Sequence, residues 1–155
     1  MNDTINTDIN ESDLNETNKR CQINILARTI YGEARGESVR GKEAVASVII
    51  NRVNYGKMRG GYWWGDDVVG VCKKPYQFSC WNENDPNFKK ITDVKPGHKV
   101  FDTCLRIAKR ALAGTLIDPT NGATHYHHEN INPPWARGRA PDTHIGKHLF
   151  YKDIE

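Results

Sequence analysis

The sequence predicts a mainly α-helical α+β domain, in which a helical core is combined with a small antiparallel β element. Apolar residues recur with helical spacing in three stretches, at residues 23–37, 41–53 and 97–113. Two short alternating segments follow, at 123–127 and 148–151, and such alternation indicates strands. With 155 residues the chain is long enough to form one domain with its own core.

The N-terminal segment has a different composition from the rest. Residues 1–20 are rich in Asn, Asp, Thr and Glu and contain few large apolar side chains, which predicts a disordered polar tail. The segment has neither a basic start nor a hydrophobic stretch, so it does not read as a secretory signal. Residues 21–155 are therefore expected to form the folded domain, and they contain no apolar run long enough to cross a membrane.

The charge distribution argues against a nucleic-acid-binding protein. The formal net charge is +3, which suits an anionic polymer but does not choose between polymers. Lys and Arg form no continuous run, and the aromatic residues cluster without basic residues between them. We therefore expect no nucleic-acid partner.

The first helical stretch contains the residue that points most clearly to chemistry. Glu33 is seven residues after Leu26 and three after Ile30, so on a continuous helix it projects from the apolar stripe. Burial disfavours the charged carboxylate and raises its pKa, which is what a general acid near neutral pH requires. The alternative is that Gly32 and Gly36 end the helix early and leave Glu33 exposed in a turn.

The second and third helical stretches supply the core. Residues 41–53 are apolar around nearly the whole circumference, which predicts a central helix. One line of polar residues runs along this helix, formed by Glu43, Ser47 and Asn51. It faces either a cleft or solvent. The third helix carries an apolar stripe and is expected to end at Gly114.

Residues 54–87 form a glycine-punctuated aromatic segment. Such a composition suits loops that line a groove, where flat aromatic faces stack on sugars or bases. The alternative is that the aromatic side chains fill a small core. Of Trp63 and Trp64, at least one is expected in the core.

The four cysteines predict free thiols rather than a disulfide framework. They are Cys21, Cys72, Cys80 and Cys104, and no CxxC pair occurs. Cys72 and Cys80 flank a short loop and could pair after release from a reducing compartment. None has the sequence context of a catalytic cysteine.

Several motifs together resemble the SleB/CwlJ-type cell wall hydrolase family, which includes the catalytic domains of spore cortex-lytic enzymes and related bacterial and phage lysins. In order along the chain, they are LARTIYGEARGE, GKEAVASVIINRV, PYQFSCWN, GATHYHH, PPWAR and IGKHLFY. The resemblance implies a lysozyme-like, lytic transglycosylase-like fold. It also implies cleavage of peptidoglycan between N-acetylmuramic acid and N-acetylglucosamine, with Glu33 as the essential glutamate.

The resemblance also suggests which residues bind substrate. It places the segment from Gln77 to Ser79 and the strand containing Tyr126 along the groove. The full set of expected substrate-binding residues is Tyr31, Gln77, Phe78, Ser79, Trp81, Tyr126, His127 and Trp135. No metal and no cofactor is expected.

The number of carboxylates that the sequence singles out as catalytic bears on the mechanism. Glycosidases usually pair an acid with a second carboxylate, whereas enzymes resembling lytic transglycosylases use one glutamate as acid and then as base. Because Glu33 is the only carboxylate that a motif singles out, the sequence favours the one-glutamate mechanism and its 1,6-anhydromuramic products. A hydrolytic muramidase or glucosaminidase is the alternative, with candidate second acids Glu37, Asp66, Asp67, Glu83, Asp85 and Asp142.

Two other classes of function remain open. Histidines could hold zinc in an amidase or peptidase, although no HExxH spacing occurs; they are His125, His127, His128, His144 and His148. A non-catalytic wall-binding module is the second, and it would stack saccharides on Tyr62, Trp63, Trp64 and Trp81.

The expected partner is peptidoglycan, bound by a monomer without stable membrane insertion. Since the tail does not read as a secretory signal, the sequence predicts synthesis in the bacterial cytoplasm. Action on the wall would then follow holin-type or other non-classical release, as for a phage endolysin.

Overall fold

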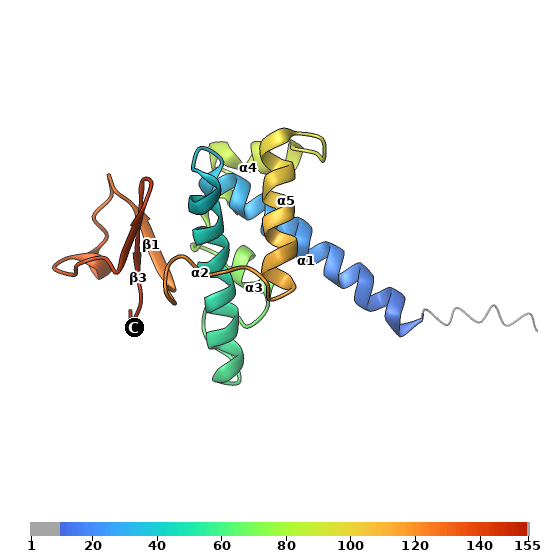
Figure 1. Cartoon of the computed structure of the whole chain (residues 1–155), viewed down its shortest axis with the longest axis horizontal. Coiled ribbons are helices and arrows are strands. Elements are labelled where there is room, and N and C mark those ends of the chain that lie inside the picture. Colours follow the sequence, from blue (N-terminus) through green and yellow to red (C-terminus); the bar gives the residue numbers. More distant parts are fainter. Residues whose placement is uncertain (1–9, 155) are drawn as a thin grey trace, which may run out of the picture.

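The computed structural model describes residues 10–154, and the helices and the sheet occupy different parts of it. Figure 1 shows α2 (Val39–Met58) and α5 (Lys99–Leu112) side by side, with α1 (Glu11–Ala34) crossing them and the sheet on the other side of α2. Most buried apolar side chains form one cluster that joins all five α-helices. The predicted mainly helical architecture with a small β element is confirmed.

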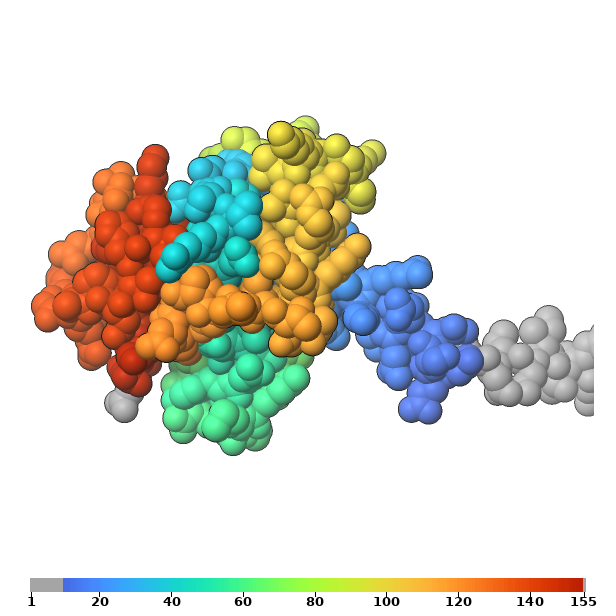
Figure 2. Space-filling model, in the orientation of Figure 1, coloured from blue at the N-terminus to red at the C-terminus, as the bar shows by residue number. Residues whose placement is uncertain are grey.

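Helix α1 begins earlier than the sequence predicted. Asn10 caps it by accepting the Ser12 backbone N–H at 3.2 Å, and Glu11 and Asp13 suit the positive end of the helix dipole. Residues 11–20, predicted as part of a disordered tail, are therefore helical, but their side chains are exposed. Figure 2 shows this part of α1 projecting from the body of the protein. The rest of the predicted tail, residues 1–9, lies outside the described residues.

Helix α2 is the central helix that its composition predicted. Ser38 caps it by accepting the Gly41 backbone N–H at 3.1 Å. One face of α2 packs against α1, α3 and α5, and another packs against the sheet. Helix α5 buries the predicted stripe, including Cys104 and Ile107, and Gly114 follows its end with a φ of +75°.

The segment between α2 and α5 contains helices that the sequence did not predict. They are α3 (Val68–Lys73), the single 3₁₀ turn η1 (Ser79–Trp81) and α4 (Pro86–Asp93). Asp67 caps α3 through the Gly70 N–H, and Asp85 caps α4 through the Asn87 N–H. These helices are too short for a clear helical period, so the capping residues were the available signal.

The small sheet has three antiparallel strands in the order β1-β3-β2. They are β1 (His125–His128), β2 (Thr143–Ile145) and β3 (His148–Tyr151), and β2 was not predicted. In the register, Tyr126 pairs with Phe150, which in turn pairs with Thr143. The sheet packs on α2 through a second apolar cluster made of Ala44, Val48, Ala123, Ile145 and Phe150. A second 3₁₀ turn, η2 (Pro134–Ala136), lies in the loop between β1 and β2.

The aromatic segment contributes to both core and surface. Trp64 is 2% exposed and donates its indole N–H to the Arg52 carbonyl at 2.9 Å, whereas Trp63 is 60% exposed. This confirms that at least one of the two is in the core. Cys72 and Cys80 are both buried free thiols. No helix in the described part of the chain is long and apolar enough to span a membrane.

Candidate active site

A groove runs between the end of α1, the segment around η1, and the sheet. It consists of three adjoining pockets. Glu33, His128 and His148 line both the first and the second pocket, whereas Arg52, Gln77 and Tyr126 line both the second and the third. The other lining residues are Ala34, Gly36, Glu37 and Lys147 at one end, Phe78, Ser79, His127 and Ile131 in the middle, and Trp63, Tyr76, His125, Trp135 and Ile154 at the far end.

Glu33 lies in the last turn of α1, where two pockets meet. The helix continues through Gly32 to Ala34, so the alternative of an early helix end is excluded. A Cβ on Gly32 would lie 2.8 Å from the Cβ of Cys80 and 2.8 Å from Cγ2 of Ile91. The absence of a side chain at Gly32 therefore allows η1 and α4 to pack directly against α1 beside Glu33.

The surroundings of Glu33 favour its protonated form. Burial raises the pKa of its carboxyl to about 7, and the negative charge of Asp85 adds to this effect. Hydrogen bonds from the Cys80 thiol and the Tyr126 hydroxyl, together with the charge of Arg52, act in the opposite direction. Burial also raises the pKa of both Cys80 and Tyr126, so both groups keep their protons and donate to Glu33.

Arg52 is the cation in the middle of the groove, and the sequence predicted no role for it in the site. Its Nε donates to the Thr124 carbonyl at 2.6 Å, and one Nη donates to Oε1 of Gln77 at 2.5 Å. The guanidinium lies over the rings of Trp64 and Phe78, each 5.4 Å from the centroid. Burial lowers its pKa to about 10, so Arg52 stays charged at neutral pH.

Glu37 is the second acidic residue of the groove. Its Oε1 accepts the Lys147 backbone N–H at 2.9 Å and lies 3.5 Å from Nδ1 of His148, without the alignment of a hydrogen bond. Gly146, with a φ of +58°, allows this approach, because a Cβ there would lie 2.6 Å from Oε1. Glu37 therefore joins the β2–β3 turn to the end of α1.

The other candidate second acids have different surroundings. None of them lines the groove. Asp67 and Asp85 cap helices, and Asp142 accepts the Lys152 N–H at 2.8 Å. Asp66 and Glu83 are exposed.

The histidines are distributed among several separate contacts. His127 bonds through its two ring nitrogens to Tyr151 and to the His128 carbonyl, and His125 contacts Thr124. His144 lies 3.7 Å from Glu129. In residues 10–154 no group of three or more His, Cys, Asp or Glu side chains could hold a metal ion. The zinc alternative therefore has no ligand set in this part of the chain.

Most of the predicted substrate-binding residues lie along the groove with Glu33, but two do not. Those that line it are Gln77, Phe78, Ser79, Tyr126, His127 and Trp135. Tyr31 instead packs edge-on against His98 and Phe101, because two residues along a helix turn it about 200° away from Glu33. Trp81 packs against the main core and donates its indole N–H to Thr29 at 2.9 Å.

The contacts of Trp81 predict a structural role for it. Trp81→Ala removes an aromatic group that packs against the core and leaves the Thr29 hydroxyl without its donor, which should cost about 3 kcal/mol of unfolding free energy. Trp63→Ala is the matched control, because Trp63 is exposed and lines the groove. Thermal unfolding should show a large fall in unfolding temperature for Trp81→Ala and little change for Trp63→Ala. The reverse order would contradict the structural role and support substrate binding by Trp81.

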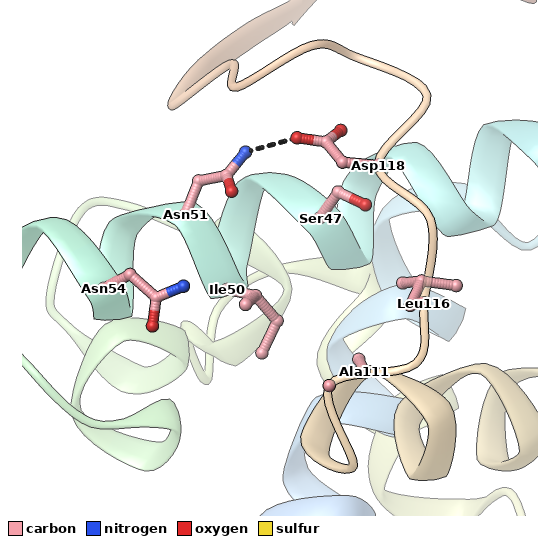
Figure 3. A pocket seen from close by; sticks show the side chains of 8 residues that line it. Ser47, Ile50, Asn51, Asn54, Ala111, Leu116 and Asp118 are labelled. Carbon is pink, nitrogen blue, oxygen red and sulfur yellow. Dashed lines mark hydrogen bonds between the residues drawn. The ribbon is translucent and has the colours of Figure 1, made fainter.

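A separate pocket lies on another face of α2. Figure 3 shows Asn51 and Ser47 of α2 facing Asp118, with Ala111 and Leu116 beside them. Asn51 donates to Asp118 at 2.9 Å, and Asp118 also accepts the Thr120 and Gly122 N–H groups. Part of the polar line of α2 thus faces a cleft, in which Asp118 holds the loop that leads to β1.

The four aromatic residues of the wall-binding alternative do not form one exposed platform. Trp64 belongs to the core, and Tyr62 and Trp81 pack against it. Only Trp63 of the four is largely exposed.

The fold and the site define a small, mainly helical domain with a half-buried acid in a groove closed on one side by a three-stranded sheet. Residues 36–151 match the family model of cell wall hydrolases. The chain therefore belongs to the cell wall hydrolase family, of the SleB/CwlJ type. The matched region begins three residues after Glu33.

Curated relatives in this family are spore cortex-lytic enzymes. The one from Halalkalibacterium halodurans is 34% identical over 131 residues, which are 83% of this chain and 34% of the relative. The one from Bacillus subtilis is 31% identical over 129 residues, which are 83% of this chain and 36% of the relative. The chain thus spans about a third of the length of these relatives.

Solved structures show the same fold. The catalytic domain of the germination-specific lytic transglycosylase SleB from Bacillus anthracis has a TM-score of 0.64 and 30% identity, covering 84% of this chain and 93% of that chain. The catalytic domain of the Bacillus cereus SleB protein has a TM-score of 0.65 and 29% identity, covering 86% and 91%. The predicted lysozyme-like fold is confirmed.

Proposed function

We propose that this protein cleaves the glycan strand of peptidoglycan between N-acetylmuramic acid and N-acetylglucosamine, as a lytic transglycosylase. The observation that carries the proposal is Glu33, a carboxyl with a raised pKa at the centre of an open groove. The neighbouring SleB catalytic domain is named a lytic transglycosylase, which supports the same reaction.

Glu33 would serve in both halves of the reaction. The protonated carboxyl first gives its proton to the glycosidic oxygen, and the bond from that oxygen to the muramoyl C1 breaks. The resulting carboxylate then takes the proton of the muramoyl C6 hydroxyl, whose oxygen bonds to C1 and closes a 1,6-anhydro ring. No water is consumed, and Glu33 ends protonated as it began.

The contacts of Glu33 suit both of its states. Because Cys80 and Tyr126 keep their protons, their hydrogen bonds stabilise the carboxylate formed between the two steps, as does the positive charge of Arg52. Burial favours the protonated form needed at the start. A pKa near 7 leaves both states accessible at neutral pH.

The lining of the groove supports a glycan as substrate. Phe78, Trp63 and Trp135 provide aromatic surface for sugar rings, whereas Gln77 and Ser79 provide polar groups. Hydrolysis is the second candidate, because Glu37 shares a pocket with Glu33.

Digestion of purified peptidoglycan tests the proposal. We expect soluble fragments cut at glycosidic bonds, with no free amino groups from amide cleavage. Activity should survive EDTA, because proton transfer by Glu33 and binding in the groove need no metal. Loss of cleavage in EDTA with recovery on adding zinc, or release of peptides instead of sugars, would contradict the proposal.

The proposed place of action is the bacterial cell wall. The relatives' names refer to the spore cortex, which agrees with peptidoglycan as the partner but does not support holin-type release from a phage-infected cell. Release of that type, the monomeric state and the absence of a nucleic-acid partner stay predictions from the sequence.

A further inference from the structure

The side chain of Gln77 has a fixed orientation in the middle of the groove. Arg52 donates to it, and a guanidinium cannot accept, so the amide oxygen must face Arg52 and the amide nitrogen must face away. This nitrogen, Nε2, is buried and has no hydrogen-bond partner among residues 10–154. Gln77 lines two of the three pockets. A buried N–H donor without an acceptor is costly, which points to an acceptor supplied by the ligand.

Arg52 gives the same part of the groove a positive charge. It too lines both of these pockets, and no carboxylate oxygen in the described residues lies within 4.0 Å of it. Thr124, Trp64 and Phe78 hold the guanidinium in place. The middle of the groove therefore presents an N–H donor beside a cation, a combination that matches a carbonyl oxygen and opposes an ammonium group.

We infer that Gln77, oriented by Arg52, binds the carbonyl oxygen of a sugar acetamido group, and that the groove therefore rejects de-N-acetylated glycan. This inference rests on the proposed function. An acetamido group is neutral, so its presence leaves Glu33 free to become negative in the first step. A carboxylate in the same place would oppose that charge. A deacetylated sugar would instead place an ammonium beside Arg52 and leave the Gln77 N–H without an acceptor.

Chemical deacetylation and reacetylation of one substrate test the inference directly. We expect cleavage of purified peptidoglycan to fall by about tenfold or more after partial de-N-acetylation, since the Gln77 N–H loses its acceptor and the new ammonium group meets the like charge of Arg52. Reacetylation with acetic anhydride should restore the rate. Equal rates on the acetylated and deacetylated samples would overturn the inference while leaving the proposed function intact.

Gln77→Glu assigns the effect to this residue. The new carboxylate would pair with Arg52 and could accept a hydrogen bond from the ammonium of a deacetylated sugar. We therefore expect kcat/KM on acetylated peptidoglycan to fall by about tenfold, and the preference for acetylated over deacetylated peptidoglycan to narrow or reverse. Gln22→Glu is the matched control, because Gln22 lies outside the groove and undergoes the same chemical change. An unchanged preference in Gln77→Glu, with a normal unfolding temperature, would overturn the inference.

Binding provides a readout that does not depend on turnover. Chitotetraose carries acetamido groups but no lactoyl group, and its deacetylated form carries ammonium groups. The inactive Glu33→Gln variant should bind chitotetraose more tightly than the deacetylated tetramer. The double variant with Glu33→Gln and Gln77→Glu should bind the two tetramers with equal affinity. If Gln77→Glu leaves chitotetraose binding unchanged and weakens only lactoyl-bearing fragments, the acceptor is the lactoyl group and the inference is wrong. Failure of the proposed function would appear separately, as absence of cleavage.

Discussion

Glu33→Gln is expected to abolish peptidoglycan cleavage, with a loss of about 10³-fold or more, while the protein stays folded. Glutamine has nearly the same shape and keeps one oxygen that accepts hydrogen bonds, but it can neither give nor take the proton in the proposed reaction. Release of soluble fragments from purified peptidoglycan measures the loss. Wild-type rates in a correctly folded Glu33→Gln variant would contradict the role given to Glu33.

The same substitution should also change how stability depends on pH. The pKa of Glu33 is raised in the folded protein, from 4.5 to about 7, so folding favours the protonated form. The wild type is therefore penalised as the pH rises from 4.5 to 7, by at most about 3 kcal/mol above pH 7. Glu33→Gln removes the penalty, so its gain in unfolding temperature should be larger at pH 8 than at pH 4. An equal gain at both values would argue against a raised pKa.

Gly32→Ala is expected to have the second large effect. The added Cβ would lie 2.8 Å from Cβ of Cys80, 2.8 Å from Cγ2 of Ile91 and 2.9 Å from the Cys80 sulfur, so η1 or α4 must move. The overpacking exceeds the gain in helix propensity and should leave a net cost of about 1–2 kcal/mol. Because Cys80 donates to Glu33, its displacement should also lower kcat by about tenfold or more.

Gly36→Ala is the matched control for stability. Gly36 is in the same GEARG motif, but a Cβ there meets nothing within 4 Å and its φ is not positive. This substitution should leave the unfolding temperature unchanged or raise it slightly. Thermal unfolding of both proteins makes the comparison. Equal effects of the two substitutions would show that close packing at Gly32 does not hold Cys80 in place.

The long helices and the general architecture could be predicted because their patterns are local. The apolar stripe of α1, the nearly complete apolar surface of α2 and the stripe of α5 repeat over several turns. The short helices α3 and α4 could not be predicted in this way, since eight residues or fewer give too little periodicity. The start of α1 was placed too late because its first ten residues contain only one large apolar side chain, Leu14, and it is exposed, so they bury no apolar face.

The centre of the site could be predicted, but its electrostatic partners could not. A carboxylate in an apolar helical stripe is unusual enough to stand out, which is how Glu33 was found. Arg52 was not predicted as a site residue, because its partners Gln77 and Thr124 are far away in sequence. Its presence in an otherwise apolar stripe was the available signal. Tyr31 was assigned to the groove wrongly, since it lies on the opposite side of α1 from Glu33.

The chemical form of the product tests the central claim most directly, that Glu33 acts alone as acid and then as base. Fragments from a complete digest should end in 1,6-anhydro-N-acetylmuramic acid, be one water lighter than hydrolytic fragments, and resist reduction by borohydride. Mass spectrometry before and after reduction measures both properties. Fragments with reducible muramic acid ends would instead show that water is the nucleophile, and Glu37, the other acid of the groove, would then be the residue to test as its base.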